Sequence, residues 1–428
     1  MKTKHTSPLC GRRVLVAVSG SIAAVKTPLL VSALIKAGAE VRCLVTTSGA
    51  ALVSPVALAS LSRHRCYLEA DQWNPAASRP LHIELAEWAD LTIVAPLSAS
   101  SLARWSQGSA DGLLASVLLA TEAPVIAAPA MNTAMWRHPA VQRNWLRIQD
   151  FPGVVPLLPE SGLLACDRVG DGRMADPLLI ELAAASVFSR GPGAPAMNLD
   201  WSGMSVLVSA GPTQEPIDPA RFLSNRSSGR MGVLLAQAAR FRGATVHLVH
   251  GPLDLPVAWL EGLQCTAVET AAELSSALHL AQPTSDVLVM SAAVADLRRE
   301  VSPAVKLDKL ELQQVLSSGW DEIPDLLSNL TRHRRPKQLI LGFSALTGDD
   351  IHLLELAESK RLSKGCDLMM VNPVDREGQG FGDQPNGGWL LGDGWRKKLP
   401  VTAKLSLAHQ LLDALIKARD QAAASMES

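Results

Sequence analysis

Short apolar runs alternate with helical segments along almost the whole chain, and this alternation constrains the fold more than any other feature. A strand that is followed by a helix and a second strand returns to the same sheet in parallel orientation, so helices cover both faces. Parallel strands are buried on both sides, which is why they read as continuous apolar runs. The pattern therefore predicts an α/β fold with doubly wound, Rossmann-like sheets. Sites in such sheets lie at the carboxyl ends of the strands.

The alternation falls into two series, which predicts two domains. In the first series we expect strands at Val14–Ser19, Glu40–Thr46, Leu91–Ala95 and Pro124–Ala128, and helices at Pro55–Ser62, Ser100–Ser106, Gly112–Ala120 and Thr133–Trp145. In the second we expect strands at Met204–Ser209, Thr245–His250, Val287–Ser291, Gln338–Phe343 and Asp367–Val371, and helices at Val233–Phe241, Ile351–Ser363 and Thr402–Ala418. The segment Phe188–Leu199 is rich in Gly and Pro and breaks the periodicity. We therefore place the domains at residues 1–190 and 201–428, with a linker at 191–200.

Composition argues against several classes of function. The 428 residues carry a formal net charge of −1, so the chain lacks the basic bias expected of a nucleic-acid-binding protein. The six cysteines form no Cys-x-x-Cys pair, which argues against a zinc site. No apolar run reaches the roughly 18 to 20 residues of a membrane span, and Met1–Cys10 lacks the apolar core of a signal peptide. We expect a cytoplasmic protein that acts on small molecules, without nucleic acid or membrane as a partner.

The most distinctive stretch is GPTQEPIDPARFLSNRSSGRMG, which runs from Gly211 to Gly232. It lies between a predicted strand and a predicted helix, where free backbone N–H groups at the start of the helix can bind an anion. It is neither a Walker A loop nor a Gly-x-Gly-x-x-Gly fingerprint. An ordinary connecting loop would also fit this position. The density of Gly, Ser and polar side chains favours a binding loop instead.

This stretch closely resembles the signature of the ligase half of bifunctional phosphopantothenoylcysteine decarboxylase/phosphopantothenate–cysteine ligases, which belong to coenzyme A biosynthesis. The resemblance runs from about Val14 to Leu412, with the motifs of both halves in the family's order. It implies a flavodoxin-like, FMN-dependent decarboxylase domain followed by a ligase domain. The implied reactions are CTP-dependent coupling of 4′-phosphopantothenate to cysteine through an acyl-cytidylate, and decarboxylation of the product to 4′-phosphopantetheine. It also implies a homo-oligomer, with trimeric flavin domains and dimeric ligase domains.

Polar residues at the ends of the first strands suit a phosphorylated cofactor. The strand-to-helix turn at Gly20–Ala23 can bind a phosphate through backbone N–H groups, although such a turn alone is weak evidence. Ser100 is one of several hydroxyl-bearing residues that follow neighbouring strands. With the resemblance, the residues expected to bind FMN are Gly20, Ser21, Ile22, Ala23, Thr46, Ser48, Pro96, Ser98 and Asp111.

Two side chains of the first half are candidates for its chemistry. His82 lies among apolar residues, where a His is usually part of the core. Asn132 follows a predicted strand, where it would serve equally as a helix cap or as a ligand for a substrate carboxylate. In the family, the residue matching His82 serves the early acid–base steps and the residue matching Asn132 holds the carboxylate.

A Gly-rich segment at Ala165–Met174 carries a thiol between two arginines. A lone Cys is more often buried and inert, but Arg168 and Arg173 favour a reactive thiol at Cys166. In the family, the matching Cys donates the last proton, and the segment that includes Arg173 and Met174 clamps the substrate. The chain departs from the family at Asp167, where Gly is common.

The second half must activate a carboxylate, which requires positive charge and Mg²⁺ against a triphosphate. Lys306, Lys309, Lys360 and Lys364 are candidate cations, although each alone reads as a surface lysine. The resemblance assigns Asn225 to stabilising the acyl nucleotide. The residues expected to contact the nucleotide are Asp296, Lys306, Ile323, Pro324, Asp325, Leu326, Phe343, Lys360 and Lys364. Mg²⁺ is expected on the CTP phosphates, and its protein ligands are left open. A loop at 379–383 is expected to close over this site.

Three departures from the family pattern surround the expected nucleotide site. Lys-Asn-Pro-Asp is replaced by Glu322–Asp325, Lys-x-Lys-Lys by Lys306–Lys309, and Glu-Thr by Leu346-Thr347. The sequence therefore specifies the reaction more firmly than the nucleotide base of the triphosphate. Two other functions fit the sequence, a decarboxylase with a degenerate second half and a non-catalytic flavin-binding protein. The intact stretch around Asn225 argues against the first, and the presence of all three decarboxylase candidates argues against the second.

Overall fold

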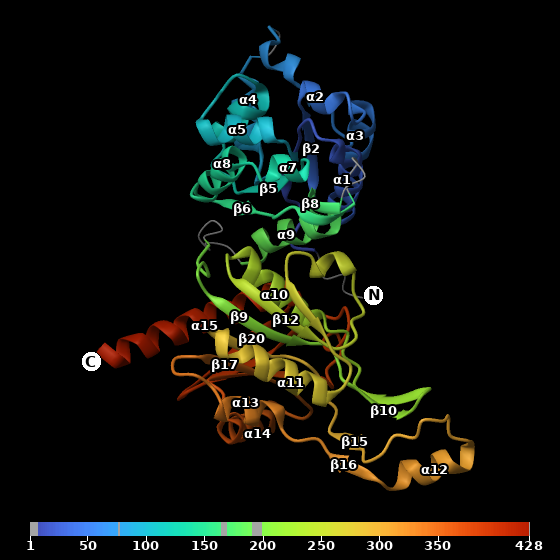
Figure 1. Cartoon of the computed structure of the whole chain (residues 1–428). Helices are drawn as coiled ribbons and strands as arrows, with labels where there is room; N and C mark the ends of the chain where they lie inside the picture. The colour runs from blue at the N-terminus through green and yellow to red at the C-terminus, as the bar shows by residue number, and fades with distance from the viewer. Residues whose placement is uncertain (1–6, 76–77, 164–168, 191–198, 428) are drawn as a thin grey trace. The chain divides into compact units, whose positions relative to one another are not determined.

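The computed structural model describes residues 7–75, 78–163, 169–190 and 199–427 of the chain. Its contacts divide the chain into two compact units, one formed by 1–199 with 257–262 and the other by 200–256 with 263–428. Each unit contains its own large sheet (Figure 1). Most of the expected linker lies outside the described residues. Phe188 and Ser189, the first residues of the segment that breaks the periodicity, complete the helix that ends the first series.

The first unit is built around a six-stranded parallel sheet with the order β3-β2-β1-β4-β5-β6. Its strands are β1 (Arg13–Val18), β2 (Glu40–Val45), β3 (Cys66–Leu68), β4 (Leu91–Leu97), β5 (Val125–Pro129) and β6 (Val154–Pro156). Its helices are η1 (Ile22–Lys26), α1 (Thr27–Lys36), α2 (Thr47–Ala50), α3 (Pro55–Ser62), η2 (Glu69–Trp73), α4 (Leu81–Trp88), α5 (Ala99–Gln107), α6 (Leu113–Ala120), α7 (Thr133–Trp136), α8 (Pro139–Gln149) and α9 (Pro177–Ser189). The strand order reverses between β1 and β4, where doubly wound sheets bind their ligands.

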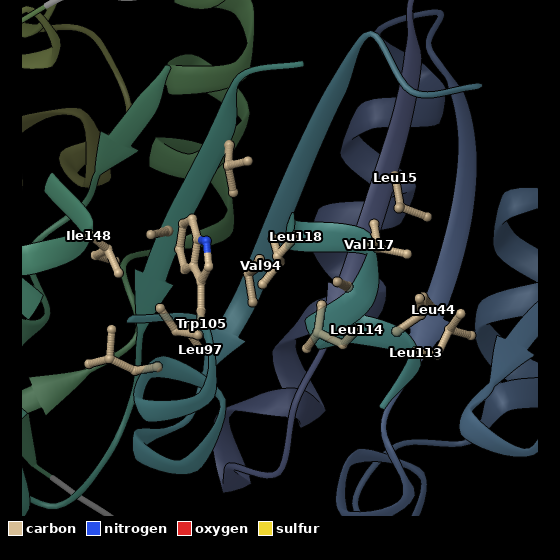
Figure 2. Close-up of a cluster of buried hydrophobic side chains, with 14 of the residues drawn as sticks. Leu15, Leu44, Val94, Leu97, Trp105, Leu113, Leu114, Val117, Leu118 and Ile148 are labelled. Atoms are coloured by element: carbon tan, nitrogen blue, oxygen red, sulfur yellow. The ribbon is translucent and has the colours of Figure 1, made fainter. Parts of the chain in front are cut away.

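The apolar runs that predict the strands form the core of this unit. Every residue of β4 and β5 is buried, as expected for strands covered on both faces. Figure 2 shows Leu113, Leu114, Val117 and Leu118 of α6 packed among the side chains of the sheet. The helices pack in two groups, α1 with α3 and α9, and α4 to α6 with α8. The unit is therefore a doubly wound α/β domain, as the alternation predicts.

The single helix expected at Thr133–Trp145 is wrong, because the structure has two helices, α7 and α8, in its place. Pro139 is the first residue of α8, and the side chain of His138 caps that helix by accepting a hydrogen bond from the Ala140 N–H at 3.2 Å. Proline lacks an N–H group and disfavours helical geometry in the residue before it. The chain therefore ends one helix and begins another at this point.

The second unit contains an eight-stranded sheet with the order β13-β12-β9-β14-β17-β18-β19-β20. Its strands are β9 (Ser205–Ala210), β12 (Thr245–His250), β13 (Gln264–Ala267), β14 (Val287–Met290), β17 (Leu339–Leu346), β18 (Leu368–Pro373), β19 (Asn386–Gly392) and β20 (Trp395–Thr402). Its helices are α10 (Arg230–Phe241), α11 (Ala271–Ala281), η4 (Gln282–Thr284), α12 (Lys309–Ser317), α13 (Leu326–Arg332), α14 (Asp350–Lys364) and α15 (Lys404–Glu427), while η3 (Val257–Leu260) groups with the first unit. The strands from β13 to β18 are parallel, whereas β19 and β20 are antiparallel additions that the sequence reading missed.

Part of the stretch from Gly211 to Gly232 is not the simple turn that the sequence predicts. It forms an antiparallel ribbon of β10 (Gln214–Asp218) and β11 (Arg221–Ser224) before α10 begins. A second ribbon, β15 (Leu297–Arg299) with β16 (Trp320–Glu322), lies beside β10, and α12 sits at its far end (Figure 1). We call β10, β11, β15, β16 and α12 the arm of the second unit.

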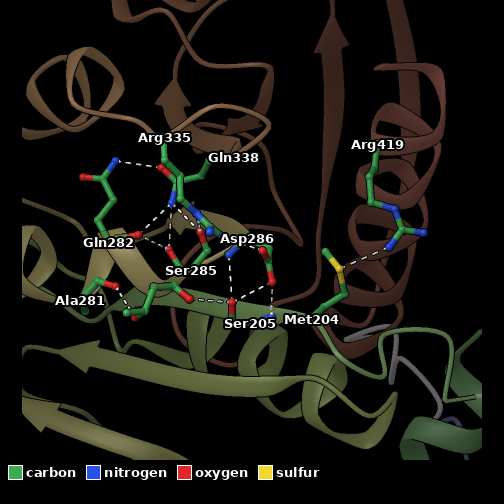
Figure 3. Close-up of polar contacts among 10 residues, drawn as sticks. Met204, Ser205, Ala281, Gln282, Ser285, Asp286, Arg335, Gln338 and Arg419 are labelled. Carbon is green, nitrogen blue, oxygen red and sulfur yellow. Dashed lines mark hydrogen bonds and ion pairs between the residues drawn. The ribbon is translucent and has the colours of Figure 1, made fainter. Parts of the chain in front are cut away.

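A polar network joins the amino ends of three parallel strands of the second unit (Figure 3). The carboxylate of Asp286 accepts hydrogen bonds from the backbone N–H and the hydroxyl of Ser205, each at 2.8 Å, and pairs with Arg335. Gln338 donates to the Ser285 carbonyl at 2.8 Å. Burial raises the pKa of Asp286, but the hydrogen bonds from Ser205 and the charge of Arg335 outweigh it, so the net pKa is lowered. The network fixes the sheet at the edge opposite the carboxyl ends.

Candidate functional site

Two cavities meet at the carboxyl ends of the strands in the first unit. A smaller one of about 320 Å³ is lined mainly by hydroxyl-bearing and charged residues, among them Thr46, Thr47, Ser48, Glu69, Ser101, Arg104 and Asp111. A larger one of about 510 Å³ has an apolar lining with a few polar groups, and includes Ser21, Ile22, Ala23, Val25, Lys26, Met131, Asn132, Met135, Arg173 and Met174. Gly20, Ser98 and Ser100 line both cavities, so the two are neighbouring parts of one site.

Most of the sequence-predicted cofactor residues gather here because they follow strands of the same parallel sheet, whereas Asp111 lies between α5 and α6. Thr46 caps α2 and Ser98 caps α5, so their backbones are fixed where β2 and β4 end. Pro96 is the exception, because it lines neither cavity. Its carbonyl instead accepts hydrogen bonds from the N–H of Ser19 at 3.2 Å and from its hydroxyl at 2.8 Å. Pro96 thereby joins the ends of β1 and β4 behind the site.

A small antiparallel sheet brings Arg173 and Met174 to the larger cavity. Its strands are β7 (Glu160–Leu163) and β8 (Val169–Arg173), so the described part of the expected Gly-rich loop is a strand. Gly172 has a φ of +145°, and a Cβ atom there would lie 2.1 Å from the carbonyl oxygen of Met131. Only glycine permits this approach, which allows the Met131 N–H to donate to the Gly172 carbonyl at 3.0 Å. Cys166 and Arg168 lie outside the described residues.

The side chain of Asn132 has a structural role at the start of α7. Its Oδ1 accepts a hydrogen bond from the N–H of Ala134 at 2.8 Å, which makes it the N-cap of α7. The helix-cap reading is therefore confirmed, and the side chain also lines the larger cavity. His82 is half-buried on α4 and lines neither cavity of its own chain.

Sequence reasoning missed three charged residues that line the two cavities. The Glu69 carboxylate accepts a hydrogen bond from the N–H of Leu113 at 2.6 Å, at the start of α6. Arg104 pairs with Asp111 at 3.1 Å on the smaller cavity, and Lys26 lines the larger one. Of the three, only Lys26 could have been found from the sequence. It lies six residues after Gly20, at the end of the helical turn that follows β1.

The second unit has a cavity of about 510 Å³ at the carboxyl ends of its parallel strands. Its lining includes nearly all the residues predicted for the second half, namely Asn225, Asp296, Ile323, Pro324, Asp325, Leu326, Phe343, Lys360 and Lys364. It also includes Ser227 to Met231 at the start of α10, the loop at Gly380–Gly382, and Asn372, Asn386 and Lys404. We call this space the second-unit cavity.

Hydrogen bonds between two strand ends shape one wall of the second-unit cavity. Thr213, in the loop after β9, accepts from the N–H of Ala295 at 3.0 Å through its hydroxyl. The side-chain amide of Asn225 donates to the carbonyls of Ala293 and Val294 at 3.2 and 2.9 Å. Asn225 therefore positions the loop after β14 and leaves its side-chain oxygen as a further polar group of the wall.

The start of α10 fits closely against the sheet because of Gly232. A Cβ atom at this position would lie 2.6 Å from both the Cβ of Ala210 and the hydroxyl of Ser291. The helix can therefore begin directly beside the ends of β9 and β14, with the N–H groups of its first turn at the second-unit cavity. This is the arrangement of an anion site.

Charged groups are distributed unevenly around the second-unit cavity. Lys364 lies 3.5 Å from Asp325, which caps α13 by accepting from the N–H of Ser328 at 3.0 Å. Burial raises the pKa of Asp325, but the hydrogen bonds from Ser328 and the charge of Lys364 outweigh it, so the net pKa is lowered. The carboxylate is therefore ionised at neutral pH. Lys360 and Lys364 give this wall its positive charge.

Lys306 and Lys309 do not line the second-unit cavity. Both are exposed: Lys309 is the first residue of α12, and Lys306 lies in the segment of the arm that joins β15 to α12. The neighbouring Leu307 N–H donates to the buried carboxylate of Asp218 at 3.2 Å, and Arg221 pairs with the same carboxylate at 3.0 Å. Asp218 thereby attaches the Lys306 segment to the β10–β11 ribbon.

Two other properties bear on the kind of protein this is. Among the residues described, no helix combines the length and apolar character needed to cross a bilayer. Within the same ranges, no three His, Cys, Asp or Glu side chains come together in a group that could hold a metal ion.

Comparison with known proteins accounts for both units. Residues 2–182 match the family model described as Flavoprotein, and residues 201–418 match that of the DNA/pantothenate metabolism flavoprotein C-terminal domain. The coenzyme A biosynthesis bifunctional protein of Escherichia coli (strain K12) is 36% identical over 415 residues, which cover 96% of this chain and 98% of that protein. Its counterpart in Bacillus subtilis (strain 168) is 37% identical over 414 residues, 94% of this chain and 96% of that protein.

A solved C-terminal domain of a coenzyme A biosynthesis bifunctional protein is 29% identical, covers 51% of this chain and 97% of that one, and has a TM-score of 0.41. The two full-length relatives match both units in one continuous alignment at more than a third identity. The chain therefore belongs to the family of bifunctional enzymes of coenzyme A biosynthesis, with a flavoprotein first half and a pantothenate-metabolism second half.

Proposed function

We propose that the chain makes 4′-phosphopantetheine in two consecutive steps. The second half couples 4′-phosphopantothenate to cysteine at the expense of CTP, and the first half decarboxylates the product with FMN. The observation that carries this proposal is the second-unit cavity, which gathers eight of the nine predicted nucleotide residues from four separate segments beside the start of α10. Family membership supports the same pair of reactions.

In the ligase step, a carboxylate oxygen of 4′-phosphopantothenate attacks the α-phosphorus of CTP, and pyrophosphate leaves. The amine of cysteine then attacks the acyl carbon, CMP leaves, and one proton is lost. Negative charge accumulates in the first of these steps, so we assign Lys360, Lys364 and the N–H groups at the start of α10 to holding the phosphates. Lys306 would approach from the arm. Mg²⁺ would enter with the CTP phosphates.

We assign Asn225 to the acyl nucleotide, because its amide already fixes the loop after β14 at the cavity wall. Asp296 and Ile323 line the same cavity, and the Ile323 N–H donates to the Asp296 carbonyl at 2.9 Å. These two residues would face the base. Leu346 is buried in the hydrophobic core and does not line the cavity, so its departure from the family pattern leaves this wall unchanged.

The first unit fits FMN in its distribution of polar and apolar groups. Hydroxyls and backbone N–H groups surround Gly20, Ser48 and Ser98, where a phosphate and a polyol chain would lie. The methionine-rich part of the larger cavity suits a flat apolar ring. When bound, FMN would supply the reversible two-electron chemistry that makes the carbon bearing the carboxylate ready to lose CO2.

The chain's own residues would position and protonate the decarboxylase substrate. We assign Asn132 to the substrate carboxylate and Arg173 to the clamp that closes over it. Cys166, which lies outside the described residues, would donate the final proton, and His82 would serve the early acid–base step. Since His82 lines neither cavity of its own chain, we propose that α4 of a neighbouring copy completes the site. This requires a homo-oligomer, and the family resemblance suggests trimers of the flavin domain and dimers of the ligase domain.

Purified full-length protein is expected to be yellow and to release FMN, not FAD, on denaturation. Ser98 and Ser54 offer a matched test, because each caps a helix by accepting a hydrogen bond at 3.3 Å, but only Ser98 lines the cavities. Either Ser→Ala change should cost about 1 kcal/mol of cap stability. Only Ser98→Ala should also lower the FMN content. A folded, colourless wild-type protein that takes up no added FMN contradicts the assignment.

The whole proposal is tested by a coupled assay with 4′-phosphopantothenate, cysteine and CTP. Formation of pyrophosphate, the cysteine amide, CO2 and 4′-phosphopantetheine in sequence is the expected result. Decarboxylation of added substrate without ligation identifies a single-activity decarboxylase, and FMN binding without either reaction identifies a non-catalytic flavoprotein. Replacing CTP by ATP in the same assay measures how strict the choice of base is.

A further inference from the structure

Lys404 places a nearly buried ammonium group at the second-unit cavity. It is the first residue of α15, is only 7% exposed, and lines the cavity. Its Nζ donates to the carbonyls of Gly380 and Gly382 at 2.8 and 2.7 Å. An ammonium has three N–H donors, and among the described residues no acceptor is recorded for the third.

The charges at this end of the cavity do not balance. Arg230, the first residue of α10, forms an ion pair of 2.5 Å with Asp383, and both Arg230 and Lys404 line the cavity or its rim. Two cations therefore face one carboxylate, whose side chain is 82% exposed. Burial and the charge of Arg230 lower the pKa of Lys404 to about 8, against the opposing effect of Asp383. An anion bound here would stabilise the charged form of the lysine.

Neutral polar groups surround the same end. Asn372 and Asn386 line the cavity, and the side-chain oxygen of Asn372 is buried without a hydrogen-bond partner among the described residues. That oxygen is an acceptor, so it would be completed by an N–H or O–H donor of a ligand, and not by a phosphoryl oxygen. The start of α10 adds further N–H donors. The two cations and the backbone N–H groups at the start of α10 are the chemistry that recognises a phosphoryl group.

We propose that Lys404 is a phosphate-binding residue of the ligase site, whose ammonium holds the Gly380–Gly382 loop and donates its third N–H to a phosphoryl oxygen. This rests on the proposed ligase function. Because the same group binds the loop and the phosphate, the loop is fixed over the cavity before the substrate arrives. Such preorganisation reduces the ordering that binding would otherwise require. The phosphoryl group belongs either to CTP or to the phosphorylated acid, and the experiment below separates the two.

The test compares Lys404→Gln with Lys404→Arg and with Lys397→Gln. Gln keeps two N–H donors for the loop carbonyls but removes the charge, whereas Lys397 is an exposed lysine of β20 that does not line the cavity. Lys404→Gln should weaken phosphate binding about 10- to 100-fold, the usual size of a hydrogen bond to a charged group. Lys404→Arg should recover most of it, and Lys397→Gln should match the wild type.

The source of the phosphate is read from separate kinetic constants. If the triphosphate binds Lys404, Lys404→Gln raises the KM for CTP and the inhibition constant of inorganic pyrophosphate. If the acid binds there, the KM for 4′-phosphopantothenate rises and the two nucleotide-side constants stay unchanged. If Lys404→Gln and Lys397→Gln have equal constants for CTP, pyrophosphate and 4′-phosphopantothenate, the proposal is wrong.

Two further measurements keep the outcome decisive. If Lys404→Gln does not fold, Asp383→Asn replaces it, since that side chain is exposed and its loss raises the positive charge at this end. It should tighten binding of inorganic pyrophosphate, and unchanged or weaker binding contradicts the proposal. Calorimetric titration with pyrophosphate is independent of turnover. A wild type that binds pyrophosphate in a Lys404-dependent way but forms no amide would refute the proposed function while leaving this site in place.

Discussion

Replacing Asn132 by Asp is expected to lower decarboxylase kcat/KM about 100- to 1,000-fold while keeping the N-cap of α7. The Oδ1 of Asn132 caps α7 through the Ala134 N–H, and Asp is as good an N-cap as Asn. Asp has no N–H to donate, however, and its charge would repel the carboxylate of the substrate. The change therefore separates the role of Asn132 in the fold from its role in binding.

Thermal unfolding and CO2 release, measured on the same preparations, check this prediction. Asn132→Ala should lower both the stability and the rate of CO2 release, with a cost of about 1 kcal/mol of stability for the missing cap. The control is His138→Asp, because His138 caps α8 and does not line the cavity. That variant should keep wild-type activity. If Asn132→Asp decarboxylates at the wild-type rate, Asn132 is only a helix cap.

Lys306→Gln and Asn225→Asp are expected to stop the ligase at different steps. A lysine beside the attacked phosphorus offsets charge that develops in the transition state, so its loss should slow pyrophosphate release about 100- to 1,000-fold with little change in CTP affinity. Asn225→Asp should still release pyrophosphate. It should then convert the acyl nucleotide slowly, because a carboxylate repels the anionic adduct. The carboxylate also cannot donate the hydrogen bonds that the amide of Asn225 makes to two backbone carbonyls.

The measurement is pyrophosphate release without cysteine, followed by cysteine addition. Lys309→Gln is the matched control, because Lys309 lies on the same arm and likewise does not line the cavity. Lys306 has to move with the arm, or reach the cavity of another copy, before it can touch the phosphates. If Lys306→Gln releases pyrophosphate at the wild-type rate, Lys306 does not act on the phosphates. Lys360 and Lys364, which line the cavity, would then neutralise the developing charge.

The parallel cores were predictable because their strands are buried on both faces and therefore read as apolar runs. The β10–β11 ribbon was not, since its buried polar residues depend on distant partners. Glu215, for example, accepts a hydrogen bond from the Ala271 N–H at 2.8 Å, and Asp218 binds the Leu307 segment. The β19–β20 pair did carry a local signal, the Asp393-Gly394 turn between two strands.

The residues after parallel strands could be grouped from sequence because carboxyl ends share one edge of the sheet. This rule finds Thr46, Ser98 and Asn132 in the first unit and the 291–296 loop in the second. It does not find Lys404, which begins a helix after an antiparallel strand and resembles any other lysine locally. Nor does it explain His82, which lies on α4 and lines neither cavity of its own chain.

The β19–β20 pair also determines how the second sheet meets its surroundings. Edge strands expose unpaired backbone groups and invite pairing with other chains, which proteins oppose with charged residues and proline. Strand β20 forms one edge and carries Arg396, Lys397, Lys398 and Pro400, while the opposite edge is β13, only four residues long. Like-charged β20 strands of two copies would repel each other, and proline lacks the N–H that a ladder needs. Both edges of the sheet therefore oppose extension by a strand of another chain.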